Sequence, residues 1–189
     1  MKLSWFALAL VSALTSCAVR YPEGTPLGSP PECLEQDLED LRGSFNAGAD
    51  RHRVMAFLSP TCPYSSRALG ALRHALDANP SLRVQVLVIW LDELPEDGAK
   101  AAHRASIVLE HDPRVHFYHD GRRRAAMALA RKVIPAGAAQ RAVLCFDPGV
   151  LWDEEPPEPG RVAHQMGRLA PEDYCPPEQL AAVLTSTWE

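Results

Sequence analysis

The sequence lacks features that several classes of protein need. Beyond a short run near the amino terminus, it has no apolar segment approaching the roughly 20 residues that a membrane-spanning helix requires. Its formal charge of -5 argues against nucleic acid as a partner, because binding to phosphates needs a basic surface. It has no glycine-rich phosphate loop, no nucleophile elbow, no pair of catalytic acids and no internal repeat. We therefore predict no cofactor.

The amino terminus has the pattern of a secretory signal. Lys2 precedes a short apolar core, and small residues follow before Cys17. Leu14-Thr-Ser-Cys17 resembles the lipobox of bacterial lipoproteins, in which the cysteine is lipidated and the peptide before it is removed. The resemblance implies an acylated Cys17, carrying chains such as palmitate, and an anchor in the cell envelope. Ala18, in place of aspartate, favours the outer membrane, facing the periplasm. An ordinary secretion signal with an unmodified Cys17 is the alternative.

Three parts are expected along the chain. Residues 1–16 form the signal peptide, and residues 17–31 form a lipidated, Pro- and Gly-rich tether. Residues 32–189 are long enough for one domain with its own core. Removal of Lys2 with the signal moves the formal charge from -5 to -6.

One cysteine stands at a predicted corner between a strand and a helix. The apolar run that begins at Val54 leads through a turn to Cys62, and Pro63 suits the first position of a helix. Leucines at helical spacing follow at Leu69, Leu72 and Leu76. Cys62 is therefore predicted at the positive end of a helix dipole, where a thiolate is favoured.

Four further positions of the expected mature chain carry cysteine besides Cys17, namely Cys33, Cys62, Cys145 and Cys175. An exported protein meets oxidising conditions, and four cysteines allow three complete pairings between which sequence cannot choose. Cys145 lies in an apolar run and is predicted to be a buried, inert thiol. A Cys33–Cys175 bridge would tie the amino-terminal arm to the last helix. Free thiols, or a bridge to Cys62, are the alternatives.

Apolar periodicity predicts the order of the elements. Strands are expected at 53–58, 82–91 and 141–147, and a short strand or extended loop at 115–118. Helices are expected at 63–78, 96–110, 122–133 and 177–187. Residues 150–153 are expected to pair back as a hairpin after a tight turn, and the prolines of 154–175 predict irregular structure.

This order, with Cys62 opening the first core helix, resembles the thioredoxin fold over residues 50–187. The resemblance implies an α/β domain in which helices flank a central mixed sheet, with a helical insertion near 95–118. It also implies thiol chemistry, with protein thiols, protein disulfides or small thiols as partners.

Three positions depart from the pattern of that family. The second cysteine of C-x-x-C is Ser65, which cannot resolve a mixed disulfide but can donate a hydrogen bond to a thiolate. Thr61 stands where a tryptophan often precedes the motif. Pro135 resembles the family's cis-proline, yet six residues separate it from the next predicted strand. Either a loop is inserted there or the cis-proline is absent.

Polar residues elsewhere favour solvated surfaces. The histidines match no tight spacing of metal ligands, so surface histidines are expected over a zinc or copper site. These are His103, His111, His116, His119 and His164. His116 and His119 alternate as in an edge strand, and Asp92-Glu93 fits a solvated loop.

Two functions remain open. In the first, Cys62 forms mixed disulfides or is oxidised to a sulfenic acid, Ser65 stands beside it in the catalytic motif, and an external thiol resets it. In the second, a thioredoxin-like module without redox turnover serves binding or assembly in the envelope. The fold alone does not decide between them.

Overall fold

The computed structural model describes residues 28–34, 37–133, 141–165 and 171–188. The expected signal peptide and Cys17 lie outside these residues. The helices are α1 (Glu39–Ala47), α2 (Pro63–Ala78), α3 (Ala99–Ser106), α4 (Arg124–Val133) and α5 (Pro177–Thr187), with a short 3-10 helix η1 (Pro171–Asp173). The strands are β1 (Glu32–Cys33), β2 (His52–Leu58), β3 (Val84–Leu91), β4 (Val115–Asp120), β5 (Ala142–Phe146) and β6 (Arg161–His164). In the part of the chain that the structure describes, no helix has both the length and the apolar character to span a bilayer.

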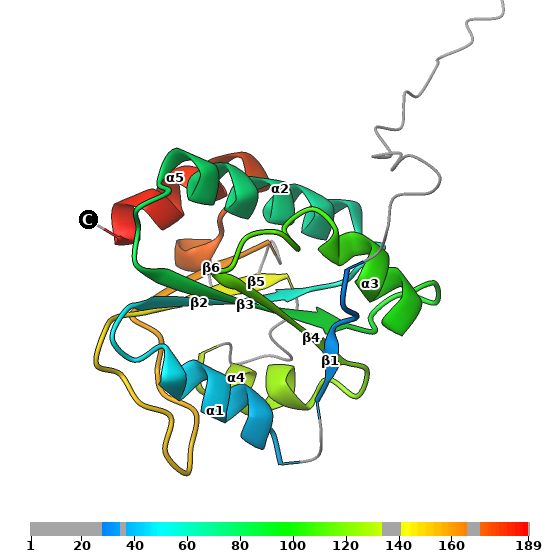
Figure 1. Ribbon diagram of the computed structural model, residues 1–189, viewed down its shortest axis with the longest axis horizontal. Helices are drawn as coiled ribbons and strands as arrows, with labels where there is room; N and C mark the ends of the chain where they lie inside the picture. Colours follow the sequence, from blue (N-terminus) through cyan, green and yellow to red (C-terminus); the bar gives the residue numbers. More distant parts are fainter. Residues whose placement is uncertain (1–27, 35–36, 134–140, 166–170, 189) are drawn as a thin grey trace, which may run out of the picture.

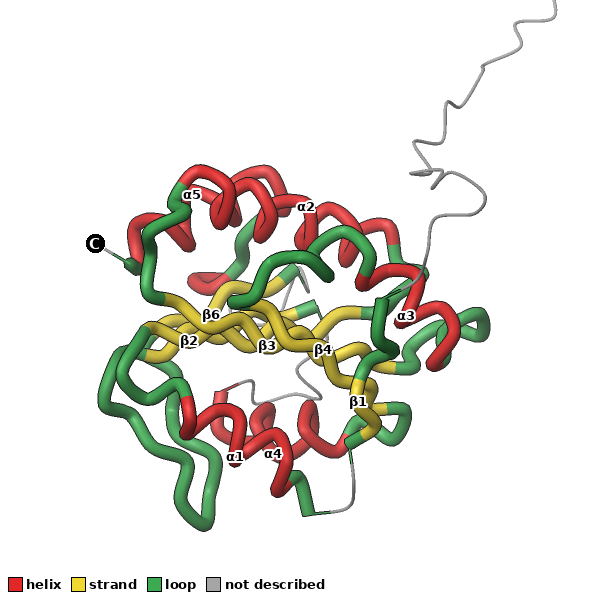
Figure 2. Tube along the Cα trace, in the orientation of Figure 1, coloured by secondary structure: helices red, strands yellow, loops and turns green. Residues whose placement is uncertain are grey.

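The described strands form one mixed sheet between two layers of helices (Figures 1 and 2). Their order is β1-β4-β3-β2-β5-β6. The first four are parallel, β5 runs antiparallel to β2, and β6 runs antiparallel to β5. Helices α2, α3 and α5 cover one face of the sheet, and α1 and α4 cover the other (Figure 1).

The centre of the sheet is the parallel pair of β2 and β3. Their register runs from His52 opposite Val84 to Leu58 opposite Trp90. Every residue of β3 is buried, because the sheet is covered on both faces. Along β2, Val54 packs with the cluster under α2 and α5, whereas Met55 packs with the cluster over α1 and α4. Continuous apolar runs are therefore required here.

Helix α2 carries the predicted apolar stripe. Its three leucines are buried together with Leu180 and Leu184 of α5 in one core cluster. Pro63 occupies the first turn, as expected, and the helix ends at Ala78 before Asn79. The packing of α2 on the sheet sets the position of its amino terminus, where Cys62 lies.

The sequence predictions of the main elements and of the fold class are confirmed. The runs at 53–58, 82–91 and 141–147 lie in one sheet, as the thioredoxin-like topology requires. The expected insertion lies between β3 and α4, but it contains a strand as well as a helix. Helix α3 is also shorter than predicted and buries Ala102 and Ser106.

The predicted hairpin at 150–153 is wrong. Strand β5 pairs instead with β6, which lies inside the stretch predicted to be irregular. The Asn46 side chain explains the difference, because its Oδ1 accepts from the Trp152 amide at 2.8 Å and its Nδ2 donates to the Trp152 carbonyl at 2.9 Å. The indole packs against Phe45, with ring centroids 6.0 Å apart. The backbone groups needed for a hairpin are therefore already used.

Strand β4 is not the edge strand that its alternation predicted. It lies between β3 and β1, and β1 was absent from the sequence prediction. Residues just before β1 are tied to the insertion, because the Gly28 amide donates to Glu110 Oε2 at 3.0 Å and the Gly28 carbonyl lies 2.7 Å from His103 Nε2. A two-residue strand with exposed side chains carries no apolar signal of its own.

The expected Cys33–Cys175 disulfide does not fit this fold. Cys33 lies in β1 at one edge of the sheet, and Cys175 is bonded through its amide to His164 of β6 at the other edge. Five strand spacings of about 4.8 Å separate these edges by about 24 Å, whereas a disulfide needs Cα atoms within about 7 Å. The four described cysteines are free thiols.

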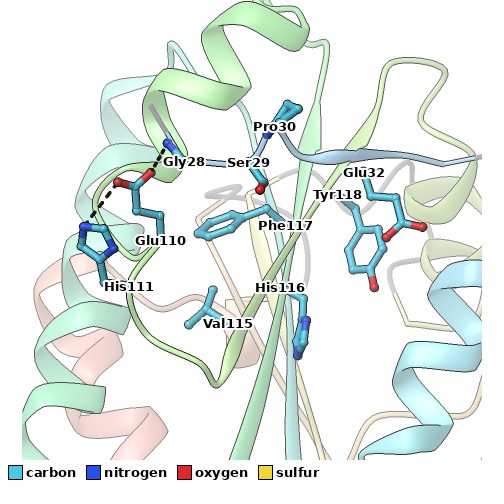
Figure 3. Close-up of a pocket in the computed structure, with 10 residues that line it drawn as sticks. All are labelled: Gly28, Ser29, Pro30, Glu32, Glu110, His111, Val115, His116, Phe117 and Tyr118. Atoms are coloured by element: carbon cyan, nitrogen blue, oxygen red, sulfur yellow. Dashed lines mark hydrogen bonds and ion pairs between the residues drawn. The ribbon is translucent and has the colours of Figure 1, made fainter. Parts of the chain in front are cut away.

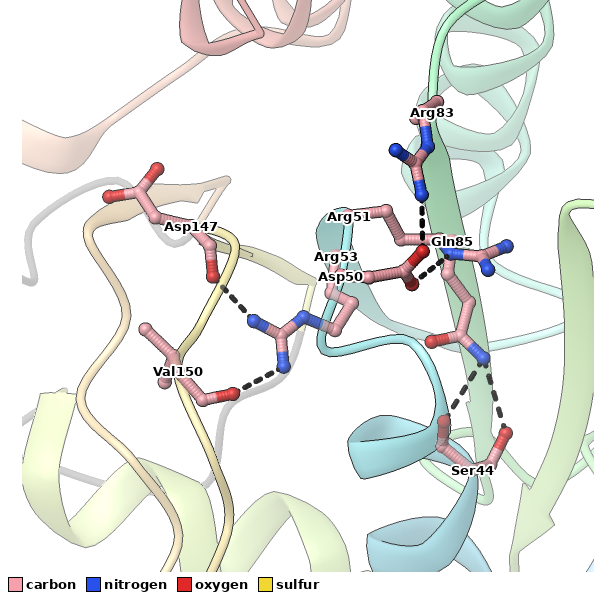
Figure 4. A network of polar contacts seen from close by, with 8 residues as sticks. All are labelled: Ser44, Asp50, Arg51, Arg53, Arg83, Gln85, Asp147 and Val150. Carbon is pink, nitrogen blue, oxygen red and sulfur yellow. Dashed lines mark hydrogen bonds and ion pairs between the residues drawn. The ribbon is translucent and has the colours of Figure 1, made fainter.

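A buried arginine joins β2 to the loop after β5 (Figure 4). Arg53 is fully buried, donates to the carbonyl oxygens of Asp147 and Val150, and lies 4.4 Å over the Phe45 ring. Burial lowers the pKa of its guanidinium, and the charge of Asp147 opposes that effect. Gln85 on the neighbouring strand donates to the Ser44 carbonyl at 3.1 Å. These bonds fix the end of the sheet remote from Cys62.

We expect Arg53→Met to lower the free energy of unfolding by about 2 kcal/mol, because two carbonyl oxygens lose their buried donor. Urea denaturation followed by circular dichroism measures this loss. Arg51→Met is the matched control, since the Arg51 side chain is partly exposed and bonds only to its neighbour Asp50 among the described residues. Equal stability of the two variants would contradict a structural role for the Arg53 bonds.

Candidate functional site

Cys62 lies at the carboxyl end of β2 and opens α2. It is the N-cap residue, with φ -76° and ψ 125°, and Pro63 follows in the first turn. No side-chain hydrogen bond caps this described helix at its amino terminus. The residue is 9% exposed. This is the strand-to-helix corner that the sequence predicted.

Ser65 lies where a second cysteine would resolve a mixed disulfide. It is fully buried, and its Oγ accepts a hydrogen bond from the Ser59 amide at 3.0 Å. The same hydroxyl keeps one proton to donate. Ser65 therefore ties the first turn of α2 to the loop before Cys62 and supplies no second sulfur.

Asp97 organises the Cys62 loop, and sequence reasoning missed it. Its carboxylate accepts from the Thr61 amide at 3.1 Å, the Thr61 hydroxyl at 2.6 Å and the Ser59 hydroxyl at 2.8 Å. It also accepts from the amides of Glu93 and Leu94 at 2.9 and 2.8 Å. One side chain therefore joins the loop after β3 to the loop after β2.

The pKa of Asp97 reflects this role. Burial alone raises the pKa of the carboxyl, but the bonds from Thr61, Leu94, Glu93 and Ser59 outweigh burial and leave the pKa below its ordinary value. The sequence contains no local signal for these contacts, because Asp97 lies 36 residues from Thr61.

Arg141 is the residue directly before β5, where a proline would lie in a thioredoxin-type groove. Ala142 pairs with Phe57, so Arg141 lies beside the end of β2 that leads to Cys62. Its φ of 51° is in the left-handed region, and its carbonyl accepts from the Gln165 amide at 3.1 Å. The candidate cis-proline, Pro135, lies outside the described residues.

Acidic and basic side chains also meet at the carboxyl ends of β3 and β4. His119 Nε2 lies 2.9 Å from Asp92, and Arg123 lies 3.4 Å from Glu93. These pairs replace the expected solvated loop. Contrary to the prediction of surface histidines, His164 is 1% exposed. Among the described residues, no group of three or more candidate ligands could hold a metal ion.

Two other cysteines lie in surroundings that suppress reactivity. Cys145 is buried in β5, as predicted, and burial raises its pKa to about 12. Cys175 is buried beside β6, and burial also raises the pKa of its thiol. A raised pKa leaves little thiolate at neutral pH, so both sulfurs are weak nucleophiles.

A separate cavity of about 340 Å³ lies where the amino-terminal arm crosses β4 (Figure 3). Its lining includes Glu32, His116 and Phe117, together with Glu110, whose carboxylate binds the arm. Cys62 does not line it. The cavity therefore belongs to the contact between arm and sheet.

The sequence matches no known protein-family model and no curated protein sequence. Among solved structures, a secreted disulfide oxidoreductase of Mycobacterium tuberculosis is similar at 14% identity and a TM-score of 0.46, over 76% of this chain and 86% of that one. A thioredoxin-family thiol:disulfide interchange protein from Chlorobium tepidum has 7% identity and a TM-score of 0.48, over 75% of this chain and 82% of that one. An uncharacterised conserved protein from Geobacillus kaustophilus has 18% identity and a TM-score of 0.47, over 85% of this chain and 81% of that one. Strand order and crossovers, rather than these alignments, define the fold of this chain as thioredoxin-like.

We expect Asp97→Asn to lower the free energy of unfolding by about 1–2 kcal/mol at pH 7, because an amide is a weaker acceptor for these donors. The folded-state pKa of Asp97 is lowered, so its carboxylate stabilises the protein above the unfolded-state pKa. This contribution is lost as pH falls through the folded-state pKa. The difference in the free energy of unfolding between variant and wild type, measured by urea denaturation, should therefore be smaller at pH 3 than at pH 7.

Asp77→Asn is the matched control, because Asp77 makes an exposed pair with Arg73 and should change stability little. If Asp97→Asn lowers the free energy of unfolding by the same amount at pH 7 and pH 3, the charge of Asp97 is not what stabilises the loop.

Proposed function

We propose that this protein is an envelope-anchored thiol redox protein whose single reactive group is the Cys62 thiolate. The observation that supports this most is the place of Cys62 as N-cap of α2, with the helix amino terminus free of any other capping side chain. The positive end of the helix dipole and the free amides favour the negative form of the sulfur. A terminal interaction of this kind is worth about 0.3–1 kcal/mol.

The chemistry is thiol–disulfide exchange through a mixed disulfide. The Cys62 thiolate attacks one sulfur of a disulfide, a bond forms between the two sulfurs, and the other sulfur leaves as a thiolate. Ser65 has no sulfur with which to close the next step, so a second, external thiolate must attack the mixed disulfide and release Cys62. A peroxide can instead oxidise the thiolate to a sulfenic acid, which an external thiol reduces in two steps with loss of water.

The amino-terminal segment supports a place in the cell envelope. Cleavage before Cys17 and acylation of that residue would anchor the chain in the outer membrane, facing the periplasm. Residues 17–31 would then act as the tether that leads into the domain at 32–189. The partners in this setting are protein thiols, protein disulfides or small thiols.

A binding or assembly module is the second candidate. Two observations favour it, namely the 9% exposure of Cys62 and the presence of Arg141 in place of a proline directly before β5. Both restrict the groove in which a thioredoxin-type protein would hold a peptide disulfide. In this case Cys62 would pack at the corner without turning over.

For the redox function, we expect Cys62 in the folded, reduced protein to be alkylated by iodoacetamide at pH 7 ahead of Cys145 and Cys175. Peptide mass spectrometry after brief labelling measures the order in which the cysteines are alkylated. Small disulfides should give a stable Cys62 mixed disulfide, and insulin reduction should be weak or absent. A Cys62 that resists alkylation while the fold is intact would leave the binding module as the better reading.

Ser65→Cys should convert the site into a dithiol, because the new sulfur stands at the resolving position of the motif. We expect it to close a disulfide with Cys62 and to prevent accumulation of the mixed disulfide, and to raise insulin reduction if the site has a cis-proline groove. The double variant Cys62→Ser, Ser65→Cys is the control, and it should neither form this disulfide nor reduce insulin faster than wild type. A Ser65→Cys protein that still accumulates the mixed disulfide would show that residue 65 does not face the Cys62 sulfur.

For the anchor, we expect Cys17→Ala to abolish acylation and cleavage at this position when the full chain is expressed in a bacterium that processes lipoproteins. Mass spectrometry of the mature amino terminus and membrane fractionation test this. An unmodified amino-terminal residue after Cys17 in the wild-type protein would contradict the lipoprotein assignment and indicate an ordinary secretion signal.

A further inference from the structure

A small cationic patch lies beside Cys62, formed by Tyr64, Arg67 and Arg141. Tyr64 is the second residue of α2 and is 48% exposed. The Cζ of Arg67 lies 5.5 Å from the centre of its ring, and the Cζ of Arg141 lies 5.9 Å from the same point. Both distances allow a cation–π interaction. One ring therefore gathers two positive charges, two residues along the chain from the candidate nucleophile.

These two guanidinium groups lack an acidic partner, as do the described Arg104, Arg122 and Arg161, whereas six other described arginines have one. Within the described chain, neither Arg67 nor Arg141 has a carboxylate within 4.0 Å. By contrast, an acidic side chain pairs with each of Arg42, Arg51, Arg73, Arg83, Arg114 and Arg123. The carboxylate of Asp97, which binds the Cys62 loop, already accepts hydrogen bonds from the amides of Thr61 and Leu94. The patch thus keeps its positive charge available.

The backbone of Arg141 supports a role beyond packing. A non-glycine residue with φ of 51° adopts a costly conformation that persists only where the surroundings impose it, and such residues gather at functional sites. Here Ala142 is held in the sheet opposite Phe57, and the Arg141 carbonyl is held by the Gln165 amide. The strained residue thereby brings its guanidinium group to the Tyr64 ring.

We infer that the Tyr64–Arg67–Arg141 patch selects low-molecular-weight disulfides that carry carboxylates as the reaction partners of Cys62. The inference rests on the proposed redox function. Guanidinium groups bind carboxylates with charge-assisted hydrogen bonds, and an exposed aromatic ring offers an apolar surface to the carbon chain. The low exposure of Cys62 and the three-residue extent of the patch favour a small reactant over a protein disulfide.

The reaction takes a low-molecular-weight thiol, R′–SH, as its second reactant. The thiolate of Cys62 attacks one sulfur of the disulfide R–S–S–R, the bond from Cys62 to that sulfur forms, and R–S⁻ leaves. While the bond is made, the carboxylate of the retained R group lies at the patch. The thiolate of a different low-molecular-weight thiol, R′–S⁻, then attacks the R-side sulfur of the mixed disulfide, which forms R–S–S–R′ and releases the Cys62 thiolate.

The test compares three disulfides that differ in charge, namely 3,3′-dithiodipropionate (anionic), 2-hydroxyethyl disulfide (neutral) and cystamine (cationic). The rate of mixed-disulfide formation on Cys62 is measured by mass spectrometry in the wild type and in Arg67→Gln and Arg141→Gln. Each variant is compared with wild type on the same disulfide, so intrinsic differences between the reagents cancel.

For the anion, each variant should react about two- to fivefold more slowly than wild type, the range expected for one exposed charge pair. The double variant should lose about tenfold, and the neutral disulfide should show no change. Cystamine should react faster in the variants. Raising the salt to 1 M should remove the difference between wild type and variants for the anion, because the Debye length falls to about 3 Å.

Arg73→Gln is the matched control, because Arg73 lies on the same helix, is exposed and pairs with Asp77. It should react like wild type with all three disulfides. Rates that do not depend on Arg67 and Arg141 would overturn the inference and leave the redox function standing. A Cys62 that reacts with none of the disulfides would overturn both. A dependence on these arginines seen with an acidic peptide disulfide, but not with dithiodipropionate, would show that the partner is a protein and overturn the choice of a small one.

Discussion

The parallel pairing of β2 with β3 is the constraint on which the rest of the structure depends. Two neighbouring parallel strands need a crossover, and here that crossover is α2. Because both faces of the pair are buried, helices must cover both sides of the sheet. The crossover begins where β2 ends, so the amino terminus of α2 and Cys62 are brought to the carboxyl edge of the sheet. Burial of the α2 leucines against α5 then holds that position.

The candidate site is assembled from segments that are far apart in the sequence. The loop before Cys62 is held to the loop after β3 by Asp97, and β5 begins beside it with Arg141. Under the proposed function, this arrangement would provide a nucleophile, a network that orders its loop and a local positive charge. The Ser65 hydroxyl accepts a hydrogen bond from the Ser59 amide and so ties α2 to the loop before Cys62, but it offers no second sulfur. Under that proposal, such a site would form a mixed disulfide rather than an internal disulfide.

Prediction from sequence succeeded where a local pattern coincided with burial. The apolar runs of β2 and β3 and the leucine repeat of α2 each report a face that the fold buries, so these elements were predicted closely. It failed where a distant side chain decided the outcome. Asn46 takes the backbone groups of Trp152 and prevents the expected hairpin, and the two-residue β1 forms because β4 offers it a partner. The Cys33–Cys175 pairing failed because sequence does not say that these residues lie at opposite edges of the sheet.

The sequence by itself determined the α/β class, the strand-to-helix corner and the identity of the residues in the Cys62 motif. It could do so because hydrophobic periodicity and the preference of proline for a first helical turn are local properties. Only the tertiary structure decided that Asp97 ties down the Cys62 loop, that Arg141 meets Tyr64 and that Cys175 is buried far from Cys33. Those relations depend on strand order and register, because contacts between residues distant in the chain exist only once the sheet has assembled.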